Sequence, residues 1–350
     1  MIEAPTKKNL SRGDYMNDRI KYLDVAKFIG IFCIYLGHFG DMAGNAYGFV
    51  FAFHVPLFFF LSGCAENFSK DIPVSKYIIK NIKNILIPCY IFALTALLMV
   101  TIDNNTHAEV MSRFMEILKG CIRNRYLASG LWFLTCLFIV KNAFYVIKKV
   151  FKFKWLILIM CVVLYCVAQL IMDPRPIINP HMLYNIDSAC YYIIYYALGY
   201  YGFGMIQKLL DWKNPINKGI CICIEIPIFI YAALLFFKKD LFTYININSM
   251  MQLVCPILKP MVLIVGILII AKAIEDIELF GMLGKNTLYL CGSEYIIKLI
   301  FPLCLKIIGL NIFYPNPLAV YMYTFFLLVL SNKMLVPVEK TIFKKLHILD

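Results

Sequence analysis

Residues 47–64 read YGFVFAFHVPLFFFLSGC, an almost unbroken apolar run. Its length approaches the ~20 residues that a helix needs to cross the hydrocarbon core of a bilayer. Comparable runs recur along the chain, at residues 23–41, 85–101, 131–147, 155–172, 189–206, 220–237, 251–270, 283–308 and 318–336. The sequence therefore predicts an all-α, polytopic membrane protein of about ten transmembrane helices.

The composition also indicates a membrane protein. Hydrophobic residues make up 61% of the 350-residue chain and charged residues only 16%, whereas soluble domains contain about 25% charged residues. A soluble fold of this size could not cover so much apolar surface. Membrane lipids are therefore the first expected partners of the chain.

The positive charge is distributed unevenly. If the N-terminus is cytoplasmic, 22 Lys and Arg residues fall in segments on the cytoplasmic side and 8 in segments on the outer side. This bias is the positive-inside pattern, so we expect both termini in the cytoplasm. The net charge of +13 is then a topology signal and predicts no nucleic-acid partner. The stretch Arg113–Arg125 is an outer segment that departs from the pattern.

The chain is expected to form one membrane domain. Residues 1–21 are a basic tail, residues 22–337 hold the apolar runs, and residues 338–350 are a second short tail, both tails being cytoplasmic. Most of the thirteen cysteines lie within the runs, without Cys-x-x-Cys spacing, which indicates packing residues and no metal site. The sequence leaves the oligomeric state open.

The first run contains three ionisable residues, Asp24, Lys27 and His38. Each costs on the order of 2.5–3.5 kcal/mol at membrane depth, which makes it a functional candidate. Lys27 and His38 are eleven residues apart, so they share one helix face and lie about 16 Å apart. Asp24 lies one turn below Lys27 and can pair with it. Alternatively, Asp24 and Lys27 are interfacial anchors and His38 bonds a neighbouring helix.

The second run contains His54, two residues before Pro56. A proline inside a helix removes a backbone hydrogen bond and commonly kinks the helix. The short connection between the first two runs, residues 40–46, places His38 and His54 near the same face of the membrane. We expect the two imidazoles to converge on one site, although His54 is also consistent with a structural role.

These motifs resemble the opening of the membrane-bound acyltransferase family 3, which includes sugar O-acetylases that act on bacterial surface polysaccharides. The main matches are Leu23-Asp-x-x-Lys27 with Gly37-His38, and the run from Phe53 to Gly63. Weaker matches are Lys80-x-x-Lys83, Trp132-Phe-Leu and Gly284-Lys-Asn-Thr-Leu-Tyr289. The resemblance covers most of the chain and implies a stand-alone domain of ten helices in a bacterial plasma membrane.

The family implies transfer of an acyl group, with acetyl expected, from cytoplasmic acyl-coenzyme A (acyl-CoA) to a hydroxyl of a cell-surface or lipid-linked glycan. It assigns an essential role to His38. Many members carry arginine where this chain has Lys27, and lysine cannot make the bidentate contacts of arginine. Many also carry histidine where this chain has Glu294. Glu294 and Lys298 are spaced i,i+4 and could neutralise each other, which leaves the role of this helix open.

We predict that His38 is the general base toward the acceptor hydroxyl, because imidazole titrates near neutral pH. A covalent acyl-histidine is the less favoured route. His54 would orient His38 or the acceptor. Ser62 and Tyr35 are candidate donors to the oxyanion.

The donor is polyanionic, so its phosphates should bind cationic side chains. Lys27, Lys80 and Lys83 are predicted to hold them at the inner face. The extended arm of the cofactor would then carry the acyl carbon outward to His38.

Two other classes of function are compatible with parts of the sequence. A multi-span transporter or glycan flippase would use intramembrane charges to line a path; the candidates are Glu225, Lys141, Lys259, Glu294 and Lys298. Transporters commonly contain inverted repeats, and none is visible in the sequence. A non-catalytic membrane scaffold would leave Lys27, His38 and His54 without a purpose.

Overall fold

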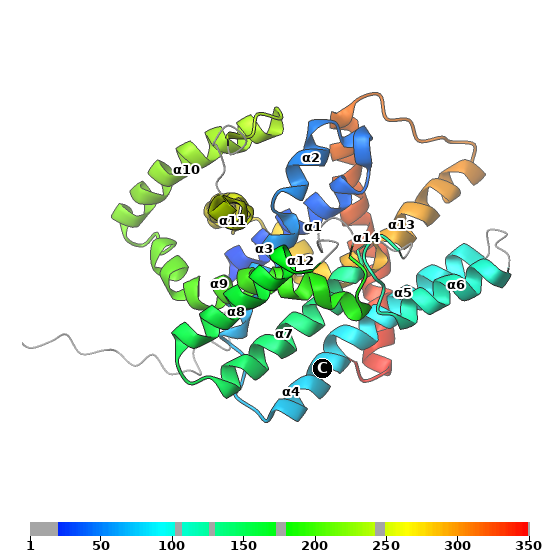
Figure 1. Ribbon diagram of the computed structural model, residues 1–350. Coiled ribbons are helices and arrows are strands. Elements are labelled where there is room, and N and C mark those ends of the chain that lie inside the picture. The colour runs from blue at the N-terminus through cyan, green and yellow to red at the C-terminus, as the bar shows by residue number, and fades with distance from the viewer. Residues whose placement is uncertain (1–19, 102–106, 126–129, 173–179, 242–248, 349–350) are drawn as a thin grey trace, which may run out of the picture.

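The computed structural model describes residues 20–101, 107–125, 130–172, 180–241 and 249–348 (Figure 1). Within these residues the fold consists of fourteen α-helices and contains no β-strand. The predicted all-α fold is confirmed.

The helices follow the apolar runs of the sequence. Their bounds are α1 Lys21–Gly37, α2 Asn45–Phe51, α3 His54–Glu66, α4 Val74–Asn81, α5 Ile87–Thr101, α6 His107–Leu118, α7 Trp132–Val150, α8 Lys154–Leu170, α9 Ile186–Leu209, α10 Pro215–Phe236, α11 Ser249–Ala273, α12 Glu278–Lys285, α13 Thr287–Ile307 and α14 Pro317–Lys345. Two 3₁₀ turns lie at Gly40–Ala43 and Leu183–Asn185, and a π-helical turn at Ile82–Leu86 joins α4 to α5.

Six helical segments of the described chain are long and apolar enough to cross a membrane, judged from length and composition. They are Asn45–Glu66, Val74–Thr101, Pro215–Phe236, Leu253–Ala273, Thr287–Ile307 and Pro317–Lys345. The chain is therefore a multi-pass membrane protein. The count of about ten and the cytoplasmic placement of the termini stay predictions.

The other four expected spans coincide with α1, α7, α8 and α9, which are shorter or more polar. α1 and α8 have 17 residues each, about 26 Å of helix, against ~30 Å for the hydrocarbon core. α7 carries Lys141 near its middle and Lys148 and Lys149 in its last turn. Tyrosines lower the hydropathy of α9. These four helices are therefore absent from the six candidate spans because they are short or carry polar side chains.

The second expected span is broken rather than continuous. α2 ends at Phe51 and α3 begins at His54, with Phe53 at φ −145° between them. Pro56 therefore lies in the first turn of α3, where its missing N–H removes no helical hydrogen bond. The disruption predicted near Pro56 is confirmed as a break on its N-terminal side.

α3 and α9 pack backbone to backbone. A Cβ atom on Gly63 would collide with the carbonyl oxygen of Tyr196, and one on Gly199 would collide with that of Phe60. Small residues at such positions let membrane helices approach closely. Since α1 also contacts α3, this close packing fixes α3 as the central support for the groups on α1.

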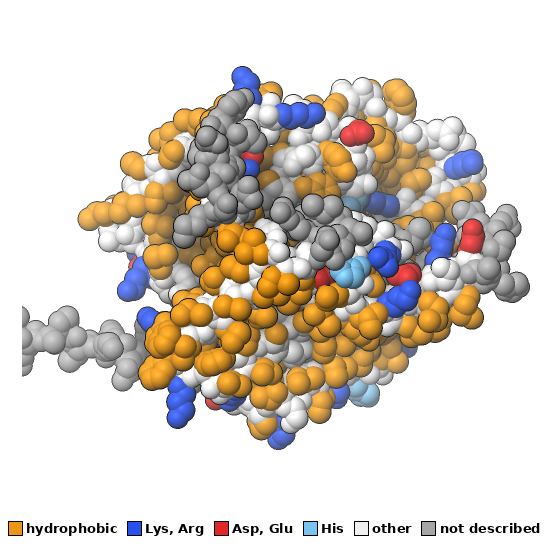
Figure 2. Space-filling model, viewed as in Figure 1, with side chains coloured by type: hydrophobic (Ala, Val, Ile, Leu, Met, Phe, Trp, Pro, Cys, Tyr) orange, Lys and Arg blue, Asp and Glu red, His pale blue; other side chains and the backbone are white. Residues whose placement is uncertain are grey.

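The surface is largely apolar. Figure 2 shows hydrophobic side chains over wide areas of the viewed face. Among the six candidate spans α10 is the least buried, with 11% of its apolar window buried, and it lies at the edge of the bundle in Figure 1. Its exposed side chains include Ile216 and Phe229. Exposure of this apolar surface to water would be unfavourable, and we expect lipid tails to cover it.

Candidate active site

Helix α1 carries a polar group at each end. At one end the Lys27 ammonium lies 3.2 Å from the Asp24 carboxylate, and the two side chains are 28% and 2% exposed. The predicted pairing of these residues is confirmed. Gly284 of α12 lies so close that a Cβ atom there would collide with the Asp24 carbonyl oxygen. At the other end His38 forms the C-cap of α1. We call these two ends of the bundle the Lys27 end and the His38 end.

A carboxylate from a distant helix holds His38. The Nδ1 atom of His38 lies 2.8 and 2.9 Å from the two carboxylate oxygens of Glu294 on α13. Lys298, one turn along α13, donates to Glu294 Oε1 at 2.7 Å and to the Tyr35 carbonyl oxygen at 2.8 Å. The predicted pair of Glu294 and Lys298 is therefore present, and the same carboxylate also binds the imidazole.

This arrangement selects one tautomer of His38. A carboxylate only accepts hydrogen bonds, so Nδ1–H of His38 donates to Glu294 and Nε2 of the neutral ring is unprotonated. An unprotonated Nε2 can take a proton from a hydroxyl. Lys298 offsets the negative charge of Glu294, which would be costly to bury alone.

His38 faces a protein-lined cavity of about 260 Å³. Its side chain is 23% exposed. The cavity is lined by His38, Gly130, Leu131, Cys291, Gly292, Glu294, Tyr295 and Lys298. The ring is thus open to a pocket that contains charged groups, as a site for a polar substrate requires.

A second cavity, of about 130 Å³, begins at Lys27. It is lined by Lys27, Ile31, Ile34, Phe58, Leu61, Ser62, Phe133, Leu134, Leu137, Thr287, Leu288 and Cys291. Most of these side chains are apolar. Cys291 lines both cavities, so this residue lies between them. Together they follow α1 from Lys27 to His38.

His54 is buried at the start of α3. It is 4% exposed, its Nδ1–H donates to the Val50 carbonyl oxygen at 2.6 Å, and its ring meets that of Phe51 edge to face. It lines neither of the two cavities. These contacts are structural, and an orienting role for His54 stays a prediction. Tyr35 likewise donates its hydroxyl to the Leu290 carbonyl oxygen at 2.7 Å, inside the core.

The remaining predicted residues are spread over three places. Ser62 lines the apolar cavity. Lys80, in the last turn of α4, and Lys83, in the π-helical turn, are exposed. Trp132 begins α7, is 8% exposed, and lies beneath the guanidinium of Arg123, whose Cζ is 4.8 Å from the ring centroid.

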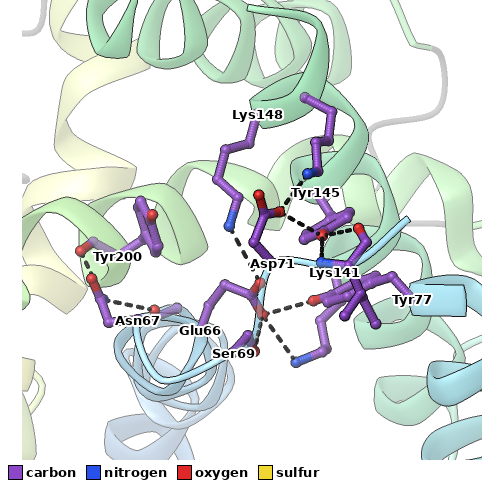
Figure 3. Close-up of polar contacts among 12 residues, drawn as sticks. Glu66, Asn67, Ser69, Asp71, Tyr77, Lys141, Tyr145, Lys148 and Tyr200 are labelled. Atoms are coloured by element: carbon purple, nitrogen blue, oxygen red, sulfur yellow. Dashed lines mark hydrogen bonds and ion pairs between the residues drawn. The ribbon is translucent and has the colours of Figure 1, made fainter. Parts of the chain in front are cut away.

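A buried polar network surrounds Glu66, and no local feature of the sequence marks it (Figure 3). The Glu66 side chain is 0% exposed and accepts hydrogen bonds from Tyr77 at 2.7 Å and Tyr196 at 3.0 Å. The ammonium groups of Lys141 and Lys148 lie 3.5 and 3.6 Å from its oxygens. One carboxylate thus faces two lysines, and a positive charge is left over.

The Glu66 network lies beyond the apolar cavity, on the side away from His38. Ser62 and Leu137 line that cavity, and Glu66 and Lys141 lie one turn further along the same helices. At the adjoining surface, a hydrogen bond from the Lys149 ammonium lowers the pKa of the exposed Asp71 carboxyl. Lys149 is thus paired with Asp71, and the Glu66 network contributes one net positive charge on this side of the cavity.

Comparison with known proteins identifies the family. The family described as an acyltransferase domain, acyltransferase family 3, matches residues 20–334, which is most of the chain and includes both cavities. No curated protein and no solved structure matches the chain. Within the described residues, no three His, Cys, Asp or Glu side chains are placed to hold a metal ion. The chain belongs to acyltransferase family 3, as its motifs predicted, and is a membrane acyltransferase.

Proposed function

We propose that the protein transfers an acyl group, acetyl in the first instance, from acyl-CoA to a hydroxyl of a cell-surface or lipid-linked glycan at a bacterial plasma membrane. The Lys27 end and both termini would face the cytoplasm in a domain of about ten spans. The observation that carries this proposal is that Cys291 lines both the cavity at Lys27 and the cavity at His38.

The apolar cavity suits the extended arm of the donor. Its walls are mainly aliphatic and aromatic, while Lys27 at its start can bind a phosphate. Lys80 and Lys83 flank Asn81, whose amide donates to Asn142 on α7 at 2.9 Å. That contact holds the two lysines on the same side of the cavity as the Glu66 network, where the other phosphates of acyl-CoA would lie.

The reaction itself would take place beside His38. Nε2 of His38 removes the proton of the acceptor hydroxyl as the oxygen attacks the thioester carbonyl carbon. The C–O bond forms, the C–S bond breaks, and the departing thiolate of CoA takes the proton from the imidazolium. Glu294 stabilises the imidazolium while it carries that proton. Ser62 lines the donor cavity on the side away from His38, so it would contact the donor arm and not the oxyanion.

The transporter alternative draws less support from the geometry. A glycan path needs polar walls, whereas the cavity that begins at Lys27 is lined mostly by apolar side chains. Lys141 pairs with Glu66, and Lys298 pairs with Glu294. These charges neutralise one another within the protein instead of lining an open path.

The test uses the full chain in proteoliposomes, with acetyl-CoA labelled in its acetyl group and a panel of oligosaccharide acceptors. We expect label to appear on the acceptor, and His38→Ala to lower the rate by at least about 10²-fold. His181→Ala is the matched control, because His181 lines neither cavity. A normally inserted His38→Ala protein that transfers label at the wild-type rate would refute the proposed base.

A further inference from the structure

One segment at the His38 end has no part in the donor route. It is the stretch Arg113–Arg125, which departs from the positive-inside pattern. This stretch consists of the end of α6 and a turn at residues 119–125. Within that stretch, among the described ion pairs, Lys119 pairs with Glu116 at 2.8 Å. Arg113, Arg123 and Arg125 are therefore the source of the excess positive charge.

Arg123 is the arginine of this turn that lies against the protein. Its guanidinium stacks on the Trp132 ring, with Cζ 4.8 Å from the centroid. The Nη1 atom is buried and has no hydrogen-bond partner in the described part of the chain. No described carboxylate forms an ion pair with it either. The guanidinium also contacts the Tyr192 hydroxyl, so Nη1 is the donor left without a partner, and an anionic ligand that accepts from it would gain a hydrogen bond.

The turn that carries Arg123 is rigidly built. Asn185, 0% exposed and in a left-handed conformation at φ 56°, accepts from the Arg123 backbone N–H at 2.9 Å. Its side-chain amide donates to the Gly120 carbonyl oxygen at 3.2 Å and to Thr135 Oγ1 at 2.9 Å. One buried side chain therefore ties the turn to the first residues of α7. The position of Arg123 is set before any ligand arrives.

The turn also adjoins the His38 cavity. Gly130 and Leu131, which directly precede Trp132, line that cavity. The Gly130 carbonyl accepts from Cys291 Sγ at 3.7 Å. The segment 130–132 thus presents the His38 cavity on one part of its surface and the ring that supports Arg123 on another. The His38 cavity and the Arg123 guanidinium therefore both contact the segment 130–132.

From this geometry we infer that Arg123, supported by Trp132, is a subsite for an anionic group on the acceptor, a carboxylate or a phosphate. The inference rests on the proposed function, since it names the class of glycan that His38 would acylate. Arginine presents paired N–H donors that match both anions. The acceptor would be an acidic glycan, bound by its charged group with a free hydroxyl at His38.

A direct test compares three acceptors in phosphatidylcholine proteoliposomes: an oligosaccharide with a uronic acid, its carboxyl-reduced counterpart, and the neutral form with one phosphate ester. We expect the wild-type kcat/KM to be at least tenfold higher for a charged acceptor than for the neutral one. In Arg123→Met the kcat/KM values for charged and neutral acceptors should become equal. Arg123→Lys should retain part of the preference for the charged acceptor. Arg125→Met, a nearby change of the same charge at an exposed residue, should keep the ratio.

A binding measurement keeps the inference testable without catalysis. The chain has three tryptophans, so Trp155→Phe with Trp212→Phe leaves Trp132 as the reporter. Titration with the uronate oligosaccharide should change its fluorescence, and Arg123→Met should raise the midpoint at least tenfold. Equal midpoints for charged and neutral sugars, or a preference that appears only in vesicles with anionic phospholipid, would overturn the acceptor subsite. Charge-selective binding without any acyl transfer would instead refute the proposed function alone.

Discussion

The carboxylate of Glu294 lies between two nitrogen atoms, 2.8 Å from His38 Nδ1 and 2.7 Å from Lys298 Nζ. It joins the end of α1 to α13, although His38 and Glu294 are 256 residues apart in sequence. Many relatives are expected to carry histidine at the position of Glu294. A carboxylate at this position places a negative charge beside the base, which a histidine side chain would not do.

Glu294→Gln should therefore lower kcat by about 10²–10⁴-fold, the range for a general base that loses its support. The amide still reaches His38 but carries no charge and can present an N–H to Nδ1, which favours the wrong tautomer. The KM for acyl-CoA should change little, because Glu294 lies at the far end of the donor route. Initial rates at saturating acceptor, with acyl-CoA varied, separate the two constants.

Glu294→Asp is the control for that variant. It keeps the charge and should recover part of kcat, whereas a purely structural role predicts that both variants lose the same thermal stability and the same activity. Equal kcat values for Glu294→Gln and the wild type would show that Glu294 serves only to neutralise Lys298.

The position of Cys291 between the two cavities gives a second prediction. Because this residue lines both cavities, Cys291→Phe should obstruct the route between them and reduce acyl transfer at least tenfold. Cys291→Ala is smaller, leaves the route open and should retain most of the rate. Both proteins are compared with labelled acetyl-CoA in proteoliposomes. Full activity of a folded Cys291→Phe protein would mean that the acyl group reaches His38 by another route.

The sequence supplied the local features of this site. Asp24 pairs with Lys27, and Glu294 with Lys298, because three- and four-residue spacings on a helix fix neighbours without reference to the rest of the fold. The break near Pro56 follows from the chemistry of proline. The family motifs identified the chain correctly, since the match covers residues 20–334.

The distant contacts could not be read in the same way. Glu294 reaches His38 only because α13 packs beside the end of α1. Glu66 directly follows an apolar run and resembles an interfacial residue, so nothing local marks it as the buried partner of Lys141. His54 donates from Nδ1 to the Val50 carbonyl oxygen, a contact that its spacing from His38 does not predict. Spacing along a helix therefore predicts neighbours within that helix but not which helices meet.

The partly buried Lys27 side chain gives a third prediction. Lys27→Ala should raise the KM for acyl-CoA severalfold, because one cation near the donor phosphates is lost. Lys27→Arg should retain the wild-type KM or improve it, since arginine can contact a phosphate through two N–H groups. Steady-state rates at fixed acceptor measure the KM.

A matched double variant separates phosphate binding from the neutralisation of Asp24. Asp24→Asn with Lys27→Met removes both charges, so no buried carboxylate is left without its lysine. If the KM still rises in this protein, the lysine acts on the donor. A KM equal to that of the wild type would assign Lys27 to the ion pair alone.

The Glu66 network gives the last prediction, and it concerns stability. Glu66→Leu would leave Lys141 and Lys148 without their carboxylate and Tyr77 and Tyr196 without an acceptor. Breaking a buried ion pair by removing one partner costs about 3–5 kcal/mol, whereas removing both partners can be nearly neutral. Glu66→Leu should therefore lower the free energy of unfolding by about that amount, and adding Lys141→Met should recover part of it.

Unfolding by denaturant in detergent micelles, with the single Lys141→Met variant completing the cycle, measures the coupling between the two residues. Strictly additive losses would show that the 3.5 Å contact between Glu66 and Lys141 contributes nothing to stability, and the two tyrosines would then account for the burial of the carboxylate.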